Sequence, residues 1–436
     1  MAPQPALESP VPAMGCRWNL ATRLGFRFCL LYFSFFSLTT QILGVLLSFP
    51  GFDFPDPSTP LHPLISWTAS HVFHLSQPLV YAETGSGDRT SDWMLCLVLL
   101  VLSSAGVALW SALDRRRDSY LTLHKWFRLA IRVALGTQML SYGFVKLVPL
   151  QMSFPYLTKL VEPYGNFSPM GVLWGSIGAS PAYEMFAGSA EVLAGILLLV
   201  PRTALLGALI CLADTIQIFT LNMTYDVPVK LLSFHLLLMS VFLLAPELSR
   251  LERFFLSDTA VEPSRQPALF ATAKRNRWAL IAQLVFLVWQ LANNGFGAWQ
   301  AWGQYGGGRP KSALYGIWNV EESTVNGKPV QPQPNDKEQW RRIIFDFPKV
   351  TYFQHMDDSM LSYITAIDSA KRSIALTRVK QSQSNLSFER IGQDQLTLDG
   401  TLSGNAVHMR LRLQDRNRFE LISRGFHWIQ ERPYSH

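Results

Sequence analysis

Apolar segments of membrane length with ionisable side chains inside them constrain this chain most strongly. Between residues 126 and 245, arginine, lysine, glutamate, aspartate and histidine lie within or at the edge of apolar runs long enough to cross a bilayer. A charged residue at such a depth disfavours insertion by about 2.5–3.5 kcal/mol. Each of these residues therefore requires a buried partner, a water-filled cavity or a function.

The composition favours a multi-pass membrane protein over a nucleic-acid binder. The chain has 436 residues, of which 49% are hydrophobic and 16% charged, so it is more apolar than a typical soluble domain. Its formal net charge is +7, but the basic residues cluster beside apolar segments, at residues 17–27, 115–117 and 274–277. That distribution is the positive-inside pattern of membrane proteins. We therefore expect the lipid bilayer, and not nucleic acid, as a partner.

Seven apolar segments are predicted to span the membrane. They cover residues 24–49, 93–113, 123–148, 181–200, 203–221, 229–245 and 278–299. The basic flanks place the N-terminus in the cytoplasm, so seven crossings place the C-terminus outside. We expect the bacterial cytoplasmic (inner) membrane, with the C-terminal domain periplasmic or extracellular.

The chain divides into six predicted regions. They are a disordered cytoplasmic N-terminus (1–22), two additional transmembrane helices with an outer loop (23–118), a four-helix membrane core (119–250), a cytoplasmic loop with the seventh helix (251–302), a Gly-rich linker (303–314) and an outer all-β domain (315–436). We also expect a short interfacial helix at 61–75 and surface-lying helical turns at 156–161 and 172–177, in the outer connection between the third and fourth spans.

The last region has the period-two pattern of antiparallel strands. Val407, Met409 and Leu411 alternate with polar residues. The other predicted strands cover 316–321, 342–347, 350–353, 362–368, 373–379, 384–391, a segment around 396–398, and 418–424 with 426–430. About eight short strands with tight turns predict a small barrel or sandwich. The Gly316-Ile317-Trp318 tripeptide resembles the Gly-x-Trp of lipocalin-like barrels.

The ionisable residues of the core fall on shared helix faces. Arg132, Gly136, Met139, Gly143 and Lys146 form one stripe. A second stripe contains Glu184, Gly188, Glu191 and Gly195. Small residues let membrane helices approach closely, and the charges then point into the bundle. We expect Lys146 to pair with Glu184 near the outer boundary and Arg132 to pair with Glu191 or Asp214 deeper in the membrane.

Two sets of candidate site residues follow from this pattern. The intramembrane polar set contains Arg132, Lys146, Glu184, Glu191, Asp214 and His235, and the outer-edge set contains Tyr142, Gly143, Tyr225, Asp226 and Lys230. One interpretation is purely structural, with ion pairs that fix helix register. The other is a polar pocket that holds an amphiphile such as a quinone headgroup, or relays protons.

A metal site is a weaker alternative. His235, Glu191 and Asp214 are a plausible hard-ligand set, but no E-x-x-H repeat on paired helices accompanies them. His62, His71 and His74 lack a carboxylate at a recognised spacing and are expected to be interfacial or solvated. We predict no metal.

The sequence contains no recognisable cofactor motif. Cys16, Cys29, Cys96 and Cys211 are scattered, with no C-x-x-C pair. There is no G-x-G-x-x-G fingerprint for a flavin and no C-x-x-C-H for a haem. The cofactor and any catalytic residue therefore stay unassigned, with a quinone as the candidate ligand.

Residues 126–245 resemble the DoxX-like family of membrane proteins. The matching pieces are LSYGFVKLVPLQ at 140–151, SPMG at 168–171, GASPAY at 178–183, EVLAGILLLVPRT at 191–203 and YDVPVK at 225–230, followed by His235. The resemblance implies an accessory component of a membrane redox or stress-response system, because the family is named for a subunit associated with thiosulfate:quinone oxidoreductase. The two helices before the core, the helix after it and the β domain are departures from simple members.

Three functions therefore compete. The first is a core that binds a quinone or another amphiphile, with the β domain docking a membrane or periplasmic redox partner. On its own the chain is then not expected to be an enzyme. The second is a non-enzymatic scaffold, and the third is a proton-coupled transporter, for which the sequence lacks an inverted repeat.

Overall fold

The computed structural model describes residues 17–49, 55–82, 84–261, 267–331, 333–334, 336–378 and 383–435. The chain forms two compact units, Met1–Phe144 with Ser189–Gly295, and Val145–Gly188 with Phe296–His436. We call them the helical unit and the barrel unit. Most of the predicted disordered N-terminus, residues 1–16, lies outside the described residues.

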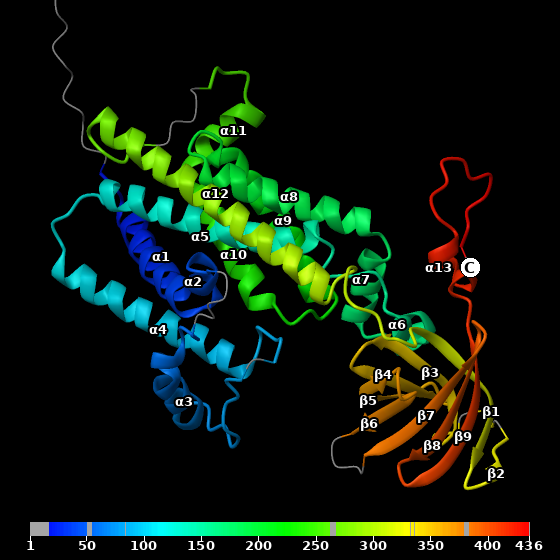
Figure 1. The fold of residues 1–436 in the computed structure, drawn as a ribbon. Coiled ribbons are helices and arrows are strands. Elements are labelled where there is room, and N and C mark those ends of the chain that lie inside the picture. The colour runs from blue at the N-terminus through cyan, green and yellow to red at the C-terminus, as the bar shows by residue number, and fades with distance from the viewer. Residues whose placement is uncertain are drawn as a thin grey trace, which may run out of the picture. The chain divides into compact units, whose positions relative to one another are not determined.

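Helices make up the helical unit (Figure 1). They are α1 (Leu20–Thr39), α2 (Gln41–Leu46), η1 (Thr59–Leu61), α3 (His62–His71), α4 (Thr90–Leu113), α9 (Ala204–Thr224), α10 (Lys230–Leu244), η3 (Ala245–Glu247), α11 (Leu248–Leu256) and most of α5 (Leu121–Leu147), α8 (Pro181–Leu199) and α12 (Ala273–Gln304). The predicted short helix at 61–75 corresponds to α3.

Five helical stretches of the described chain are long and apolar enough to cross a membrane. They are α4, α8, α9, α12 and the continuous stretch Lys230–Leu256. This confirms the predicted helical membrane part. The helices α1 and α5, with 20 and 27 residues, were also predicted to span but are not among these five.

The helices differ from the predicted segments in three places. The first predicted span is interrupted between α1 and α2, where the Thr39 and Thr40 hydroxyls donate to the carbonyls of Phe35 and Phe36. Such bonds compete with the helix ladder. The predicted cytoplasmic loop contains the amphipathic helix α11, and α12 continues through Gln304 into the predicted linker.

Small residues bring α5 and α8 together, as their stripes predict. A Cβ atom added to Gly195 would lie 2.9 Å from the Gly136 carbonyl oxygen, so the two backbones touch. A buried apolar cluster surrounds this contact, with Phe36 of α1, Leu99 of α4, Leu135 of α5 and Met239 of α10 among its members.

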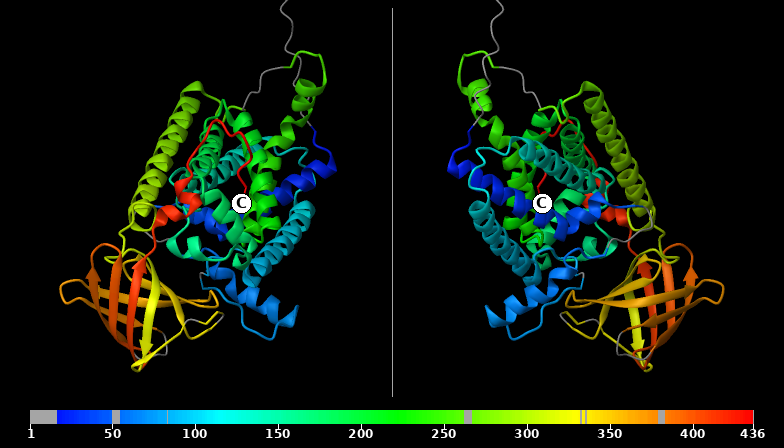
Figure 2. Two further views of the ribbon diagram at one scale, coloured as in Figure 1. Left: turned by 90° about the vertical axis from the view of Figure 1, so that its right-hand side faces the viewer. Right: turned by 90° about the vertical axis from the view of Figure 1, so that its left-hand side faces the viewer.

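The barrel unit contains a closed antiparallel β-barrel (Figures 1 and 2). The strands are β1 (Gly316–Val325), β2 (Lys328–Pro329), β3 (Trp340–Phe347), β4 (Val350–His355), β5 (Met360–Asp368), β6 (Ser373–Thr377), β7 (Ser384–Ile391), β8 (Gln395–Leu402) and β9 (Asn405–Leu413). They pair in chain order, except that β2 pairs only with β1, and β9 returns to β1. The predicted β domain is therefore an up-and-down barrel.

Alternation along the strands fills the barrel interior. Val407, Met409 and Leu411 are buried, while the residues between them are exposed, as the sequence predicts. Trp318 of the Gly-x-Trp tripeptide is fully buried and donates from Nε1 to the Leu314 carbonyl at 2.8 Å. Residue 379, at the predicted end of the sixth strand, lies outside the described residues.

The predicted strands at 418–424 and 426–430 are wrong. The chain there forms η4 (Arg416–Arg418) and α13 (Glu420–Ser423), with no strand at 426–430. Since β9 already pairs with β1, the barrel offers no free edge to a further strand. Phe426 and Trp428 are accordingly 77% and 91% exposed.

The outer connection belongs to the barrel unit. It forms α6 (Leu157–Val161), η2 (Tyr164–Asn166) and α7 (Pro169–Gly178), close to the predicted helical turns. The fully buried Asp346 of β3 accepts from the Leu157 backbone N–H at 2.8 Å and from Arg309 Nη2 at 2.7 Å. One carboxylate thus fastens both the connection and the segment before β1 to the barrel.

Candidate functional site

A polar cavity of about 670 Å³ lies in the helical unit. Its wall comes from the α1–α2 interruption, the segment before α4, the start of α4, the end of α5 and the start of α10. The lining side chains that carry hydroxyl, amide, thiol or charged groups include Thr39, Thr40, Gln41, Ser48, Ser58, Tyr81, Arg89, Asp92, Cys96, Ser141 and Tyr142.

The interruption between α1 and α2 places Gln41 against α5. Its Nε2 donates to the Tyr142 hydroxyl at 2.7 Å and lies 3.5 Å from Gln138 Oε1. Gln138 and Tyr142 are four residues apart on α5 and share a face. Gln41 and Tyr142 line the cavity, so one wall presents a paired amide and phenol.

His235 does not line the cavity but contacts two residues that do, Leu231 and Phe36. Its Nδ1 is 2.6 Å from the Leu231 carbonyl oxygen, which can only accept, so Nδ1 carries the proton. In the neutral ring Nε2 then accepts from the Tyr32 hydroxyl at 2.8 Å. The ring also stacks on Phe36, with centroids 3.8 Å apart, and Phe36 lines the cavity.

Two acidic residues at the start of α4 fix neighbouring segments: Asp88 just before the helix and Asp92 in its first turn. Asp88 accepts from the backbone N–H groups of Lys230 and Leu231, at 2.8 and 2.9 Å, and so caps the start of α10. Asp92 forms a two-point pair with Arg89, with both N–O distances 2.9 Å. Arg89, Asp92 and Leu231 line the polar cavity, so these contacts fix part of its wall.

Arg132 does not form the predicted ion pair with Glu191 or Asp214. Its Nε donates to the Leu198 carbonyl at 2.9 Å and its Nη2 to the Leu199 carbonyl at 3.4 Å. The last carbonyls of a helix have no partner within the helix and carry partial negative charge. The buried Arg132 therefore supplies hydrogen-bond donors to the carbonyls at the end of α8. Arg128, one turn earlier, donates to the Leu243 carbonyl near the end of α10 in the same way.

Glu184 and Lys146 lie in the barrel unit, within electrostatic range of each other. Glu184 is fully buried, and its Oε1 accepts from the Met152 backbone N–H at 2.8 Å. This carboxylate therefore fastens the chain just after α5 to the start of α8. Lys146 is also buried.

Glu191 and Asp214 are brought near one thiol. Both lie within electrostatic range of the fully buried Cys211 of α9, and Glu191 also lies within range of Tyr142. Neither carboxylate lines the polar cavity itself.

The predicted outer-edge residues are divided among different places. Tyr142 lines the polar cavity, and Gly143 is buried within α5. Asp226, with a positive φ of 52°, pairs with Lys230 at 2.9 Å in the turn between α9 and α10. Tyr225 is the residue that ends α9.

Sequence reasoning missed most of the cavity lining. Gln41 lay inside an apparently continuous predicted span, and Cys96 was considered only for a C-x-x-C pair. The spacing of Gln138 and Tyr142 was the available signal.

Within the described residues, no group of three His, Cys, Asp or Glu side chains is arranged to hold a metal ion. The alternative set of His235, Glu191 and Asp214 is therefore not brought together as ligands. The histidines near α3 also separate, since His62 stacks on Tyr81 and His71 stacks on Trp67.

Comparison with known proteins gives one informative relative. No protein-family profile and no solved structure matches the chain. The uncharacterized protein YwoB of Bacillus subtilis (strain 168) is 36% identical over 113 residues, which make up 26% of this chain and 71% of the relative. At that identity and coverage, the chain belongs to the same family as YwoB.

Proposed function

We propose that the helical unit binds the polar head of a membrane amphiphile, such as a quinone, in the polar cavity. The single observation that carries this proposal is a 670 Å³ cavity lined by hydrogen-bonding side chains in a helical membrane part. Small-molecule sites commonly have volumes of about 300–1,000 Å³ with a few placed polar groups.

The wall offers groups that suit a carbonyl- or hydroxyl-bearing ring. The amide of Gln41 and the phenol of Tyr142 already lie within hydrogen-bonding distance of each other, at 2.7 Å. A ligand oxygen beside them can accept from either group. Phe36 and Leu95 supply apolar surface next to these polar groups.

The wider role follows from the resemblance to the DoxX-like family. We propose an accessory component of a membrane redox or stress-response system, which depends on another subunit for electron transfer. The N-terminus then lies in the cytoplasm of a bacterium and the barrel on the outer side of the cytoplasmic membrane, where it docks a redox partner.

Binding of a short-chain quinone to the purified full-length protein tests the proposal. Tyr142→Phe and Gln41→Leu are each expected to weaken binding about two- to tenfold, the effect of one lost hydrogen bond. Tyr225→Phe is the matched control, because Tyr225 does not line the cavity. Equal affinities in all four proteins would contradict a site at this cavity.

A second candidate, a non-enzymatic scaffold, is favoured by a different observation. Arg128, Arg132 and Glu184 bind backbone groups, which is a structural task. Glu191→Gln separates the two functions. A scaffold predicts mainly a loss of stability, whereas an amphiphile site predicts a stable protein with impaired binding, since Glu191 lies within electrostatic range of Tyr142.

A further inference from the structure

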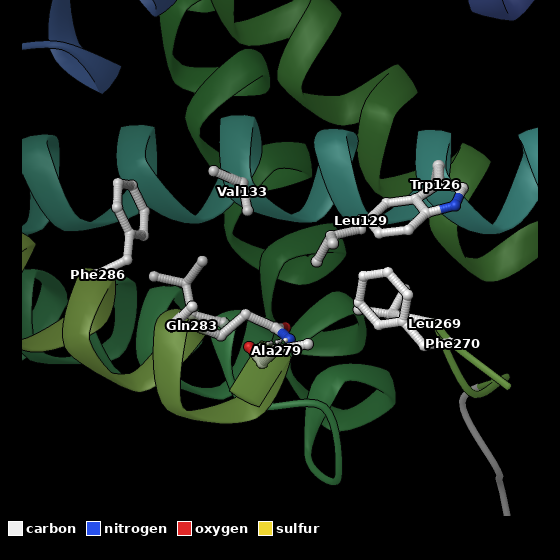
Figure 3. Close-up of a pocket in the computed structure, with 10 residues that line it drawn as sticks. Trp126, Leu129, Val133, Leu269, Phe270, Ala279, Gln283 and Phe286 are labelled. Carbon is white, nitrogen blue, oxygen red and sulfur yellow. Dashed lines mark hydrogen bonds between the residues drawn. The ribbon is translucent and has the colours of Figure 1, made fainter. Parts of the chain in front are cut away.

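The helical unit contains a second cavity, which is smaller than the polar cavity and has an almost entirely apolar lining. It has a volume of about 400 Å³ and lies between α5 and α12 (Figure 3). Trp126, Leu129 and Val133 of α5 face Gln283 and Phe286 of α12 across it, and Leu269 and Phe270 close one end. We call it the apolar cavity.

The lining has almost no hydrogen-bonding capacity. Gln283 is the one polar lining side chain besides the Trp126 indole; its Nε2 donates to the Ala279 carbonyl of its own helix at 3.1 Å, and its buried Oε1 has no hydrogen-bond partner among the described residues. The remaining lining side chains are aliphatic or aromatic. Such a cavity favours a hydrocarbon chain over water, because water needs two or more polar partners.

A ring contact and several hydrogen bonds fix the end of the cavity formed by Leu269 and Phe270. The Trp126 and Phe270 rings meet edge to face, 5.4 Å apart. Lys125 Nζ donates to the carbonyls of Ala268 and Leu269, both at 2.8 Å, and the Asn276 side chain bonds both the N–H and the carbonyl of Phe270. The wall is therefore preformed rather than dependent on a ligand.

The exposed surface beside the apolar cavity indicates that the hydrocarbon chain comes from the lipid bilayer. One side of the cavity is α12, which is long and apolar enough to cross a membrane. Its neighbouring residues Leu284, Val285 and Val288 are 40%, 63% and 64% exposed, as expected for a surface in contact with lipid. A lipid tail can enter from the bilayer beside this helix.

The charge at the start of α12 identifies the headgroup. Lys274, Arg275 and Arg277 are exposed within its first turns, and its first turn has no acidic residue. Each basic residue at a membrane surface attracts anionic lipid by about 1 kcal/mol, or about fivefold. A neutral lipid gains no such attraction.

We infer that the apolar cavity holds one acyl chain of an anionic glycerophospholipid, whose headgroup lies on the basic start of α12. The lipid then occupies a fixed place between α5 and α12 instead of exchanging freely with the surrounding bilayer. This inference does not rest on the proposed quinone site, which lies at other residues.

Photo-crosslinking of the full-length protein tests it. The protein is placed in nanodiscs of phosphatidylcholine with phosphatidylglycerol that carries a photoreactive group in its acyl chain, and the labelled peptides are mapped by mass spectrometry. We expect labels on the lining residues Trp126, Phe270 and Phe286. Labelling spread evenly over the exposed residues of α12 would overturn the inference.

Cavity-filling variants supply the matched comparison. Ala282→Trp, or the milder Ala279→Leu, should remove most of the labelling of Trp126 and Phe270, because both alanines line the cavity. Val288→Trp, on the same helix but outside the lining, should leave it unchanged. Unchanged labelling in a folded Ala279→Leu protein would contradict a chain in the cavity.

Two further kinds of variant test the recognition of the headgroup and of the acyl chain. Neutralising Lys274, Arg275 or Arg277 should lower the preference for phosphatidylglycerol over phosphatidylcholine about fivefold per charge. Gln283→Leu should leave acyl labelling intact, since the chain needs no hydrogen bond there. Loss of labelling in Gln283→Leu, or no preference between the two lipids, would overturn the assignment to an anionic lipid tail.

Discussion

The β-barrel and the helical unit each enclose an interior space, but side chains fill the first and leave part of the second open. In the barrel, inward-facing side chains such as Trp318, Phe345 and Phe353 are at most 1% exposed and fill the interior. In the helical unit, amide, hydroxyl and thiol groups line an open volume. The barrel interior therefore has no room for a ligand beside these side chains, whereas the helical unit has an open volume beside hydrogen-bonding groups.

Buried charge has the same task in both units. Asp346 in the barrel unit and Arg132 in the helical unit both satisfy backbone groups. Charge alone therefore does not mark the binding site. The proposed site rests instead on the open volume and on the hydrogen-bonded Gln41 and Tyr142 that line it.

Asp346→Ala should have the largest effect on stability and should act on the barrel unit. It leaves Arg309, whose side chain is only 13% exposed, without its carboxylate and leaves the Leu157 N–H without an acceptor. Breaking a buried pair costs about 3–5 kcal/mol. Chemical unfolding measures the loss, and Asp394→Ala, at an acid that is 60% exposed, should cost at most about 1 kcal/mol.

Arg132→Leu should come next and should act on the helical unit. It removes a charged donor from the carbonyls of Leu198 and Leu199, a loss of about 1.5–3 kcal/mol. Unfolding in mild detergent measures it, with the exposed Arg202→Leu as control. Loss of quinone binding in Arg132→Leu with unchanged stability would contradict the structural task assigned to Arg132.

Gly195→Ala should destabilise the contact between α5 and α8. The new Cβ would lie 2.9 Å from the Gly136 carbonyl oxygen, and overpacking of this kind costs about 1–3 kcal/mol. At Gly297 of α12 no atom lies within 4 Å, so Gly297→Ala should be neutral or stabilising. Equal thermal stabilities of the two variants would show that the helices need not approach so closely.

The smallest expected effect is the pH-dependent part of the stability loss in Tyr120→Phe, since the Tyr120 hydroxyl also accepts from the buried Arg27 guanidinium. The Tyr120 hydroxyl donates to Asp114 at 2.9 Å, and this hydrogen bond is the main reason that the pKa of Asp114 lies below its ordinary value of 3.8. A lowered pKa stabilises the folded state above that value, and the stabilisation is lost as the pH falls through the lowered pKa.

The difference between the midpoints of wild type and Tyr120→Phe should therefore be larger at pH 7 than below about pH 3.8, where only the loss of the acceptor for Arg27 remains. A difference that stays constant down to acid pH would exclude this contribution from Asp114.

The spacing of residues along the sequence was sufficient to predict both the β domain and the close packing of helices in the membrane part. Alternation at Val407, Met409 and Leu411 predicted β9, and the stripes containing Gly136 and Gly195 predicted a close helix contact. Both follow from local spacing, which a sequence displays directly. The ring closure by β9 with β1 is a distant pairing, and it explains why the last predicted strands were wrong.

The partners of the charged residues were harder to predict. Charges on neighbouring spans suggest one another as partners, but a sequence does not show the unsatisfied carbonyls at a helix end that Arg132 binds. The cavity depends on the interruption at Thr40, and Thr39 and Thr40, which each donate a hydroxyl to a carbonyl of α1, look like ordinary span residues in the sequence. The site therefore emerged from tertiary structure more than from pattern.

The most direct test of the polar cavity is to identify what remains bound after gentle extraction of the full-length protein. Mass spectrometry should find a quinone or a related amphiphile with the wild type, and much less with the Gln41→Leu, Tyr142→Phe double variant. No such molecule in the wild type, or equal amounts in both proteins, would contradict the proposal that the polar cavity is a binding site.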